Sequence, residues 1–131
     1  IGAVSLFVAA IGIANTMMMS IYERTKEIGV LKVLGCALGD IRTMFLMEAG
    51  FIGFMGGVLG LGLSYSVSAA INKFLGASLS GMTGGSGAIS RIPLWLSGSA
   101  VVFAVLIGML AGLFPALRAM KLSPLAAIRN E

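Results

Sequence analysis

The chain has 131 residues, of which 58% are hydrophobic and only 11% are charged. Soluble domains carry charge on about a quarter of their residues, so this composition excludes an ordinary soluble protein. The net charge of +4 does not indicate nucleic-acid binding, because the basic residues flank apolar stretches and no recognition motif accompanies them. A single cysteine, Cys36, and the absence of histidine exclude an internal disulfide and a zinc site.

Three apolar stretches predict an all-α integral membrane protein with three transmembrane helices, at about residues 1–22, 44–72 and 92–117. A spanning helix needs about 20 predominantly apolar residues, and lipid offers no partner for an unpaired backbone group. The first stretch begins at Ile1, with no basic region before it and no cleavage site after it, which argues against a signal peptide. We interpret the sequence as a piece of a longer protein.

A charged segment at residues 23–43 follows the first span and forms an amphipathic elbow. Apolar residues recur at positions 21, 28, 31, 34, 38, 41 and 45, a helical spacing with the charges on other faces. Gly29, Gly35 and Gly39 interrupt it, which predicts short helices with a turn near Gly35. Asp40 is the predicted N-cap of the next helix. Such an elbow either lies on the membrane surface or presents its apolar ridge to a partner's groove.

Small residues recur every four positions in the second and third spans and predict close helix packing, against other spans or a second subunit. The second span has Gly56, Gly60, Ser64 and Ser68, with Gly53 and Gly57 one position off that line. The third has Ala100, Ala104, Gly108, Gly112 and Ala116. The glycines chosen as packing positions are Gly56, Gly60, Gly108 and Gly112.

Three single residues in and beside these spans have local interpretations. Glu48 is expected at the inner start of the second span, as a carboxylate in the capping region. Pro93 suits the start of the last span, and Pro115 is expected to kink or end it. No charge lies near the middle of a span, which argues against a proton-driven carrier.

The distribution of charge predicts the orientation in the membrane. Seven basic residues lie in the elbow and in the tail at 118–131, whereas the loop at 73–91 has only Lys73 and Arg91. Positive residues beside spans favour the cytoplasmic side, so we expect a multi-pass cell-membrane protein with the N-terminus outside and the C-terminus in the cytoplasm. The outer loop is rich in Gly and Ser and is expected to be a flexible connector.

Two motifs resemble the MacB/FtsX-like permeases of ABC transporters. The elbow reads ERTKEIG at residues 23–29 followed by Leu34-Gly35-Cys36, similar to the family's ERxxEIGxxxxxGA pattern. Residues 114–129, FPALRAMKLSPLAAIR, resemble its PAxRAxxxxPxxALR ending. The similarity covers essentially the whole chain, and Cys36 departs from the family's usual alanine.

This resemblance implies the last three of four helices, with a large extracytoplasmic domain between the first and second helices of the whole protein. It implies a homodimer or heterodimer that works with an ATP-binding subunit or domain. The elbow would be its coupling helix, with apolar residues filling a groove of the ATPase and charged residues at the rim. The expected coupling surface comprises Arg24, Glu27, Leu31, Lys32, Leu34, Gly35 and Leu38.

The function expected from these features is that of a permease in an ATP-driven exporter or mechanotransmission complex. The sequence has no GxxxxGK[ST] motif, so we expect no enzyme activity and no bound cofactor in this chain, with ATP-Mg held by the partner ATPase. One alternative is a signalling or scaffold subunit that regulates a partner without transport. Another is a small self-contained membrane protein such as a holin.

Overall fold

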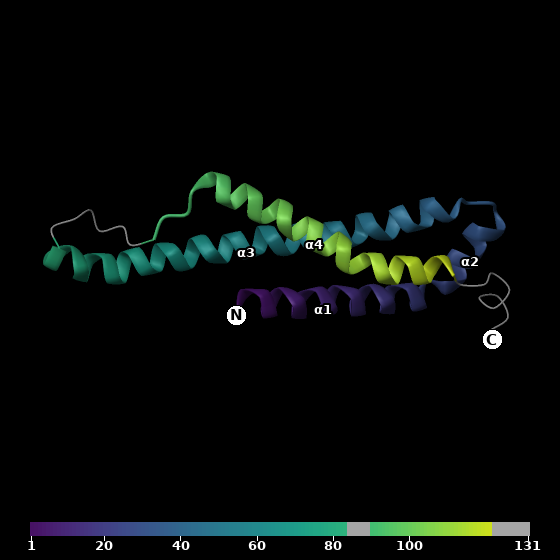
Figure 1. Ribbon diagram of the computed structural model, residues 1–131, viewed down its shortest axis with the longest axis horizontal. Helices are drawn as coiled ribbons and strands as arrows, with labels where there is room; N and C mark the ends of the chain where they lie inside the picture. Colours follow the sequence, from purple (N-terminus) through teal and green to yellow (C-terminus); the bar gives the residue numbers. More distant parts are fainter. Residues whose placement is uncertain (84–89, 122–131) are drawn as a thin grey trace.

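The computed structural model describes the backbone of residues 1–83 and 90–121, and the side chains of 1–74 and 90–121. All secondary structure in these ranges is helical, in the order α1 (Gly2–Glu23), α2 (Thr25–Val33), α3 (Leu38–Thr83) and α4 (Leu94–Met120) (Figure 1). Three helices are long and apolar enough to cross a membrane: α1, α3 over Leu38–Phe74, and α4. The predicted all-α membrane architecture is therefore confirmed.

The elbow consists of α2 and the turn that follows it. Only Arg24 separates α1 from α2, and the chain then reverses before α3 begins at Leu38. Gly35 has a φ of 87°, its N–H bonds the Lys32 carbonyl at 3.2 Å, and the Cys36 N–H bonds the Leu31 carbonyl at 3.0 Å. This pair of bonds around a left-handed glycine is the Schellman motif that ends many helices. The expected turn at Gly35 is thus present.

The start of α3 differs from the sequence-based expectation. The Ala37 carbonyl accepts bonds from the N–H groups of Asp40 and Ile41, at 3.0 and 3.4 Å, so Ala37 occupies the N-cap position. The assignment of Asp40 as the N-cap was therefore wrong. Asp40 lies inside the first turn, where its negative charge still interacts favourably with the helix dipole. Because α3 begins before the apolar run does, Glu48 lies well inside the helix rather than in its capping region.

The length of α3 also exceeds the expected span. Its 46 residues extend about 69 Å at about 1.5 Å per residue, more than twice the roughly 30 Å of a bilayer's hydrocarbon core. The helix continues to Thr83, where a loop from residue 73 was expected. Residues 84–89 of that loop and residues 122–131 of the tail lie outside the described residues.

The last helix begins directly after Pro93, whose carbonyl accepts bonds from the N–H groups of Leu96 and Ser97. Pro115 is buried within α4 and does not end it, because the helix continues to Met120. In Figure 1, α4 crosses α3 along its first half and runs beside α1 along its second half. Pro115 therefore does not end the helix, and the alternative that it kinks the helix stays a prediction.

The buried core lies at one end of the molecule, where all four helices meet. It comprises Met17, Ile21, Ile28, Ile41, Phe45, Ala49, Ala116 and Ala119. Towards the other end, α1 no longer covers α3 and α4 (Figure 1). Large apolar side chains such as Phe7, Leu59 and Phe103 are exposed along the three long helices, as suits helices surrounded by lipid.

Candidate functional site

The surface at the elbow is the first candidate site, because it exposes apolar side chains on α2, at the Gly35 turn and at the first residue of α3. Leu34 is 76% exposed and Leu38 52% exposed, at the two ends of the Gly35 turn. Val30 and Val33 are exposed on α2 as well, although the sequence argument did not choose them. Val30 lies four residues before Leu34 and Val33 lies one residue before it, and this spacing could have predicted that they share the exposed surface of Leu34. We call Val30, Val33, Leu34 and Leu38 the elbow patch.

The other predicted coupling residues divide between this surface and the interior. Arg24 and Glu27 are exposed, and Gly35 forms the turn itself. Leu31 is half-buried, so it does not share the exposure of Leu34 and Leu38. The three leucines do not lie on one helix face, because Leu31 and Leu34 belong to the end of α2 and Leu38 begins α3 beyond the turn at Gly35.

Lys32 contacts the last turn of α4. Its Nζ donates to the carbonyls of Ala119 and Met120, at 3.2 and 2.8 Å. Burial lowers the pKa of Lys32 below its ordinary value of 10.5. A lysine near a helix C-terminus satisfies carbonyls that have no partner within the helix and interacts favourably with its dipole. This contact directs the Lys32 side chain towards α4, and the assignment of Lys32 to the rim of an ATPase contact stays a prediction.

The elbow is held in place by the core beneath it. Ile28 is 1% exposed and belongs to the same buried cluster as Ile21 and Ala119. Thr25 donates its hydroxyl to the carbonyls of Ile21 and Tyr22, at 3.0 and 2.8 Å, which joins α2 to the last turn of α1. The elbow patch therefore sits on a packed support and is not a loose loop.

The second candidate feature is the close contact between α3 and α4. A Cβ added at Gly53 would lie 2.5 Å from the Ala104 carbonyl oxygen, and one at Gly108 would lie 2.7 Å from the Ala49 carbonyl oxygen. One added at Gly112 would collide with the Ala49 side chain. The predicted positions Gly108 and Gly112 thus lie in this contact, together with Gly53 and Gly57.

Gly56 and Gly60 do not take part in that contact. Both are exposed, and a Cβ added at either would have no heavy atom of the described chain within 4 Å. The contact of α3 with α4 instead uses Gly53 and Gly57, which lie on another line of α3, because one residue rotates the helix by about 100°. Packing of Gly56 and Gly60 against a second subunit stays a prediction.

A polar cluster fastens the connection between α3 and α4 at the opposite end from the elbow. The Asn72 side chain donates to the Ser90 carbonyl at 2.7 Å and accepts from the Ser90 N–H at 2.9 Å. The hydroxyls of Ser68 and Ser90 lie 2.9 Å apart, and those of Tyr65 and Ser97 lie 2.7 Å apart. No pattern in the sequence predicts this cluster, because its partners come from different segments.

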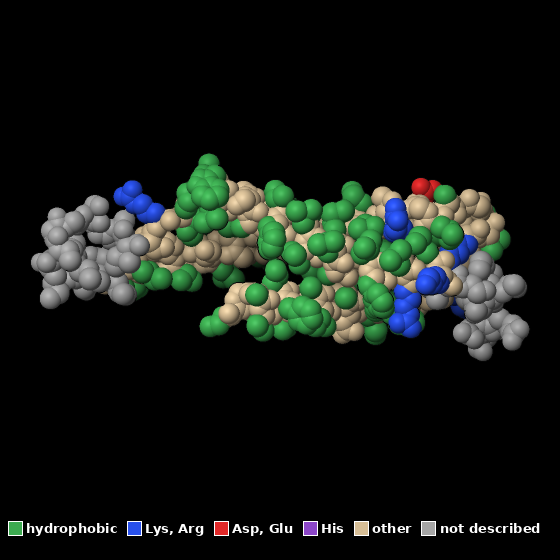
Figure 2. Space-filling view, viewed as in Figure 1, with side chains coloured by type: hydrophobic (Ala, Val, Ile, Leu, Met, Phe, Trp, Pro, Cys, Tyr) green, Lys and Arg blue, Asp and Glu red, His purple; other side chains and the backbone are tan. Residues whose placement is uncertain are grey.

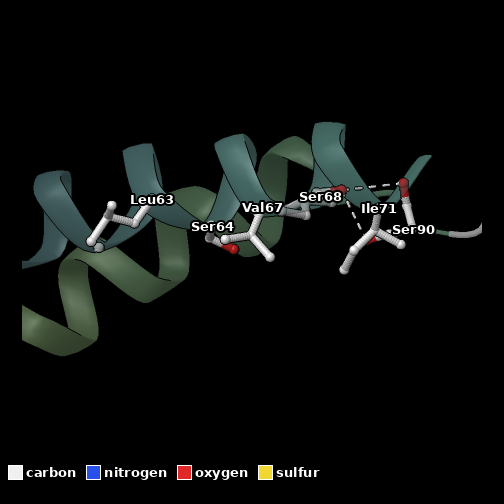
Figure 3. Close-up of a pocket in the computed structure, with 8 residues that line it drawn as sticks. Leu63, Ser64, Val67, Ser68, Ile71 and Ser90 are labelled. Atoms are coloured by element: carbon white, nitrogen blue, oxygen red, sulfur yellow. Dashed lines mark hydrogen bonds between the residues drawn. The ribbon is translucent and has the colours of Figure 1, made fainter. Parts of the chain in front are cut away.

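An open groove runs along α3 next to this cluster. Its volume is about 420 Å³, and Figure 3 shows Ser68 pointing towards Ser90, with Leu63, Ser64, Val67 and Ile71 along the same stretch of α3. Within the described ranges, no group of three or more Cys, Asp or Glu side chains is placed to hold a metal ion.

The basic side chains gather mainly at the elbow end of the molecule (Figure 2). The contact of Lys32 with Ala119 and Met120 places α2 and the last turn of α4, with Arg118, at that same end. Away from that end, Lys73 lies on α3 and Arg91 lies in the connection that precedes α4. The arrangement has two basic ends of unequal charge, separated by long apolar helices.

The chain matches the family described as FtsX-like permease C-terminal over residues 1–124. It is 38% identical to the ABC transporter permease YtrF of Bacillus subtilis, covering all of this chain and 31% of that protein. It is similar to the macrolide export ATP-binding/permease proteins MacB of Neisseria gonorrhoeae, at 36%, and of Bdellovibrio bacteriovorus, at 40%. These alignments cover the whole chain but only 19% and 18% of those proteins. The chain thus spans less than a third of these relatives.

Proposed function

Because this chain belongs to the FtsX-like permease C-terminal family, we propose that it is the membrane part of an ABC permease that is moved by a separate or fused ATPase. The proposal rests on the family match and on the elbow patch. Relatives are named ABC transporter permeases, and two are named as combined ATP-binding and permease proteins. ATP-Mg would be bound by the ATPase and not by this chain.

The single observation that supports this role best is the exposed elbow patch on a packed support. Leu34 is 76% exposed at the turn that follows α2, and the ends of the long helices pack together beneath this turn. Exposed apolar side chains that cluster together are typical of protein or membrane contacts. We propose that the patch seats in an apolar groove of the ATPase, with Arg24 and Glu27 at the edge of the contact.

The proposed mechanism uses the short connections around the elbow. One residue joins α1 to α2, and four residues join α2 to α3. Ile28 holds α2 against the core in which α1, α3 and α4 meet. A displacement of the elbow by the ATPase would therefore act on all three long helices. The work would be done on the far side of the membrane, as transport or as mechanical force.

We propose that the elbow and the last turn of α4 face the cytoplasm. This orientation follows from the excess of Lys and Arg at that end of the molecule. It also puts the elbow patch on the side where ATP is available. A homodimer or a heterodimer of permeases would complete the complex.

The test uses the whole permease with its ATPase. In Leu34→Asp, the contact loses an apolar side chain whose burial contributes about 1.5–3 kcal/mol. We therefore expect the affinity for the ATPase to fall about ten- to hundredfold. The control is Leu34→Met, which keeps the apolar volume and should bind nearly as wild type. The measurements are co-purification with the ATPase and ATP turnover in the complex.

The contrary result is also clear. If Leu34→Asp inserts in the membrane, retains the ATPase at wild-type affinity and couples fully, the elbow patch is not the docking surface. It would then lie against the membrane. Transport assays on the reconstituted complex separate a transporter from a regulatory scaffold.

A further inference from the structure

Lys32 joins two helices that are far apart in the sequence. Its Nζ lies 2.8 Å from the Met120 carbonyl oxygen and 3.2 Å from that of Ala119, across 88 and 87 residues. Figure 1 shows α2 beside the end of α4. The contact thus connects the elbow to the last turn of the last membrane helix.

The chemistry of this contact favours a cation. The last four carbonyls of a helix have no partner within it, and the C-terminal end has a partial negative charge. Ala119 is fully buried, so its carbonyl is poorly placed to find water. An ammonium group has three donors and satisfies more than one such carbonyl at once. A neutral side chain of the same length leaves both carbonyls without this donor.

The cation that bonds these carbonyls comes from α2 and not from α4. Arg118 lies in the last turn of α4 and Lys121 directly after it, yet both are exposed. The backbone N–H of Lys121 is directed at the Ala119 carbonyl, and among the described side chains it is Lys32 of α2 that donates to both carbonyls. If a residue of α4 itself donated to these carbonyls, the bonds would not depend on the position of α2. The Lys32 contact holds only while α2 and the end of α4 keep their relative position.

We propose that Lys32 is a positioning residue that fastens the elbow to α4, so that movement of the elbow displaces the end of α4. Its role in coupling rests on the proposed function; the fastening itself does not. Thr25 provides the corresponding connection between α2 and α1 through its bonds to Ile21 and Tyr22. The elbow is then bonded to one long helix on each side.

The first measurement tests the fastening in the whole permease with its ATPase, reconstituted in nanodiscs. Native Cys36, which is exposed, and a cysteine at Phe114→Cys, also at an exposed position, take nitroxide labels. Pulsed electron paramagnetic resonance then gives the distance distribution between the turn and α4. Cysteines elsewhere in the protein are replaced. The variants are Lys32→Met, Lys32→Gln and Lys32→Arg, with Lys26→Met as the matched control, an exposed lysine on the same helix.

We expect a narrow distribution in the wild type and in Lys26→Met. In Lys32→Met and Lys32→Gln the loss of charge-assisted bonds should raise the population with α2 detached about tenfold or more. Lys32→Arg should restore the narrow distribution, because it retains the cation. A distribution as narrow in both neutral variants as in the wild type overturns the fastening. A broadening that Lys32→Arg does not reverse overturns the assignment to the cation.

The second measurement tests the role in coupling. ATP is added with vanadate, and the shift of the Phe114→Cys label relative to a label on the far connection is recorded. We expect a shift in the wild type that is largely lost in Lys32→Met, while the ATPase stays bound. A full shift in Lys32→Met overturns the coupling role. If the wild-type permease does not bind the ATPase at all, the proposed function is contradicted. The distance distributions between the two labels still show whether Lys32 fastens α2 to α4.

Discussion

Two glycines of α3 that differ by three positions have opposite environments. A Cβ at Gly53 would lie 2.5 Å from the Ala104 carbonyl oxygen, whereas one at Gly56 would have no neighbour within 4 Å. Lipid gives helices no hydrophobic reason to associate, so the closeness of their backbones decides the strength of the contact. The contact between α3 and α4 therefore depends on individual glycines and not on the abundance of glycine in the helix.

A pair of matched substitutions tests this at the residue scale. Gly53→Ala forces the backbones of α3 and α4 apart and should destabilise the pair by about 1–3 kcal/mol. Gly56→Ala meets no atom and gains helix propensity, so it should be neutral or stabilising by up to about 1 kcal/mol. The measurement is the unfolding midpoint of the permease in detergent as denaturant is added. Equal loss in both variants, measured on the monomeric permease so that contacts with a second subunit play no part, would show that α3 is rotated relative to α4 from the arrangement described.

At the scale of elements, the elbow depends on one reversal of the chain. Gly35 has a φ of 87° and lies in a Schellman motif, after which only Cys36 and Ala37 precede α3. An L-residue with a side chain disfavours this left-handed region by about 1–2 kcal/mol. The turn sets the separation of Leu34 and Leu38, and hence the shape of the elbow patch.

The consequence is a second matched pair. Gly35→Ala should reduce stability by about 1 kcal/mol or more and weaken ATPase binding, because the elbow patch loses its shape. Gly39 is helical and has open space around it, so Gly39→Ala should leave ATPase binding unchanged and raise stability by up to about 1 kcal/mol through helix propensity. Hydrogen exchange of residues 33–38 reads the turn, and co-purification reads the binding. Similar exchange in Gly35→Ala and wild type would contradict this account of the turn.

The existence of the elements could be predicted from the sequence, but their ends could not. Runs of apolar residues report where a helix lies in lipid, and all three spans were found in this way. They do not report where a helix continues into water, so α3 begins at Leu38 rather than near 44 and continues to Thr83. The turn at Gly35 was predictable because glycine itself produces the local conformation.

For the candidate site, local features were again the predictable part. The exposure of Leu34 and Leu38 follows from apolar residues beside a turn outside the membrane. The inward direction of Lys32 depends on where α4 ends in space, 87 residues away, and no periodicity contains that information. The same holds for the bond of Asn72 to Ser90, which requires the path of the connection between α3 and α4.

At the scale of the whole molecule, one end is a packed junction of all four helices, and the remainder is less covered. The buried core joins all four helices at the elbow end, whereas α1 leaves the outer parts of α3 and α4 uncovered (Figure 1). A force applied at the elbow thus enters where the helices are packed together. Far from the elbow, Ser68 and Asn72 of α3 are bonded to Ser90 in the connection that precedes α4.

The central claim is that the elbow patch touches the ATPase in the cytoplasm, and photo-cross-linking tests it directly. A photo-reactive benzoylphenylalanine replaces Val33 in the elbow patch or, as a control, Leu63, which is equally exposed on the membrane-spanning part of α3. After irradiation of the intact complex in membranes, we expect the photo-reactive residue at position 33 to cross-link to the ATP-binding subunit or domain. The same residue at position 63 should give no such cross-link. Cross-linking of Val33 to lipid alone, in a complex that still hydrolyses ATP, would contradict the claim and place the elbow on the membrane surface.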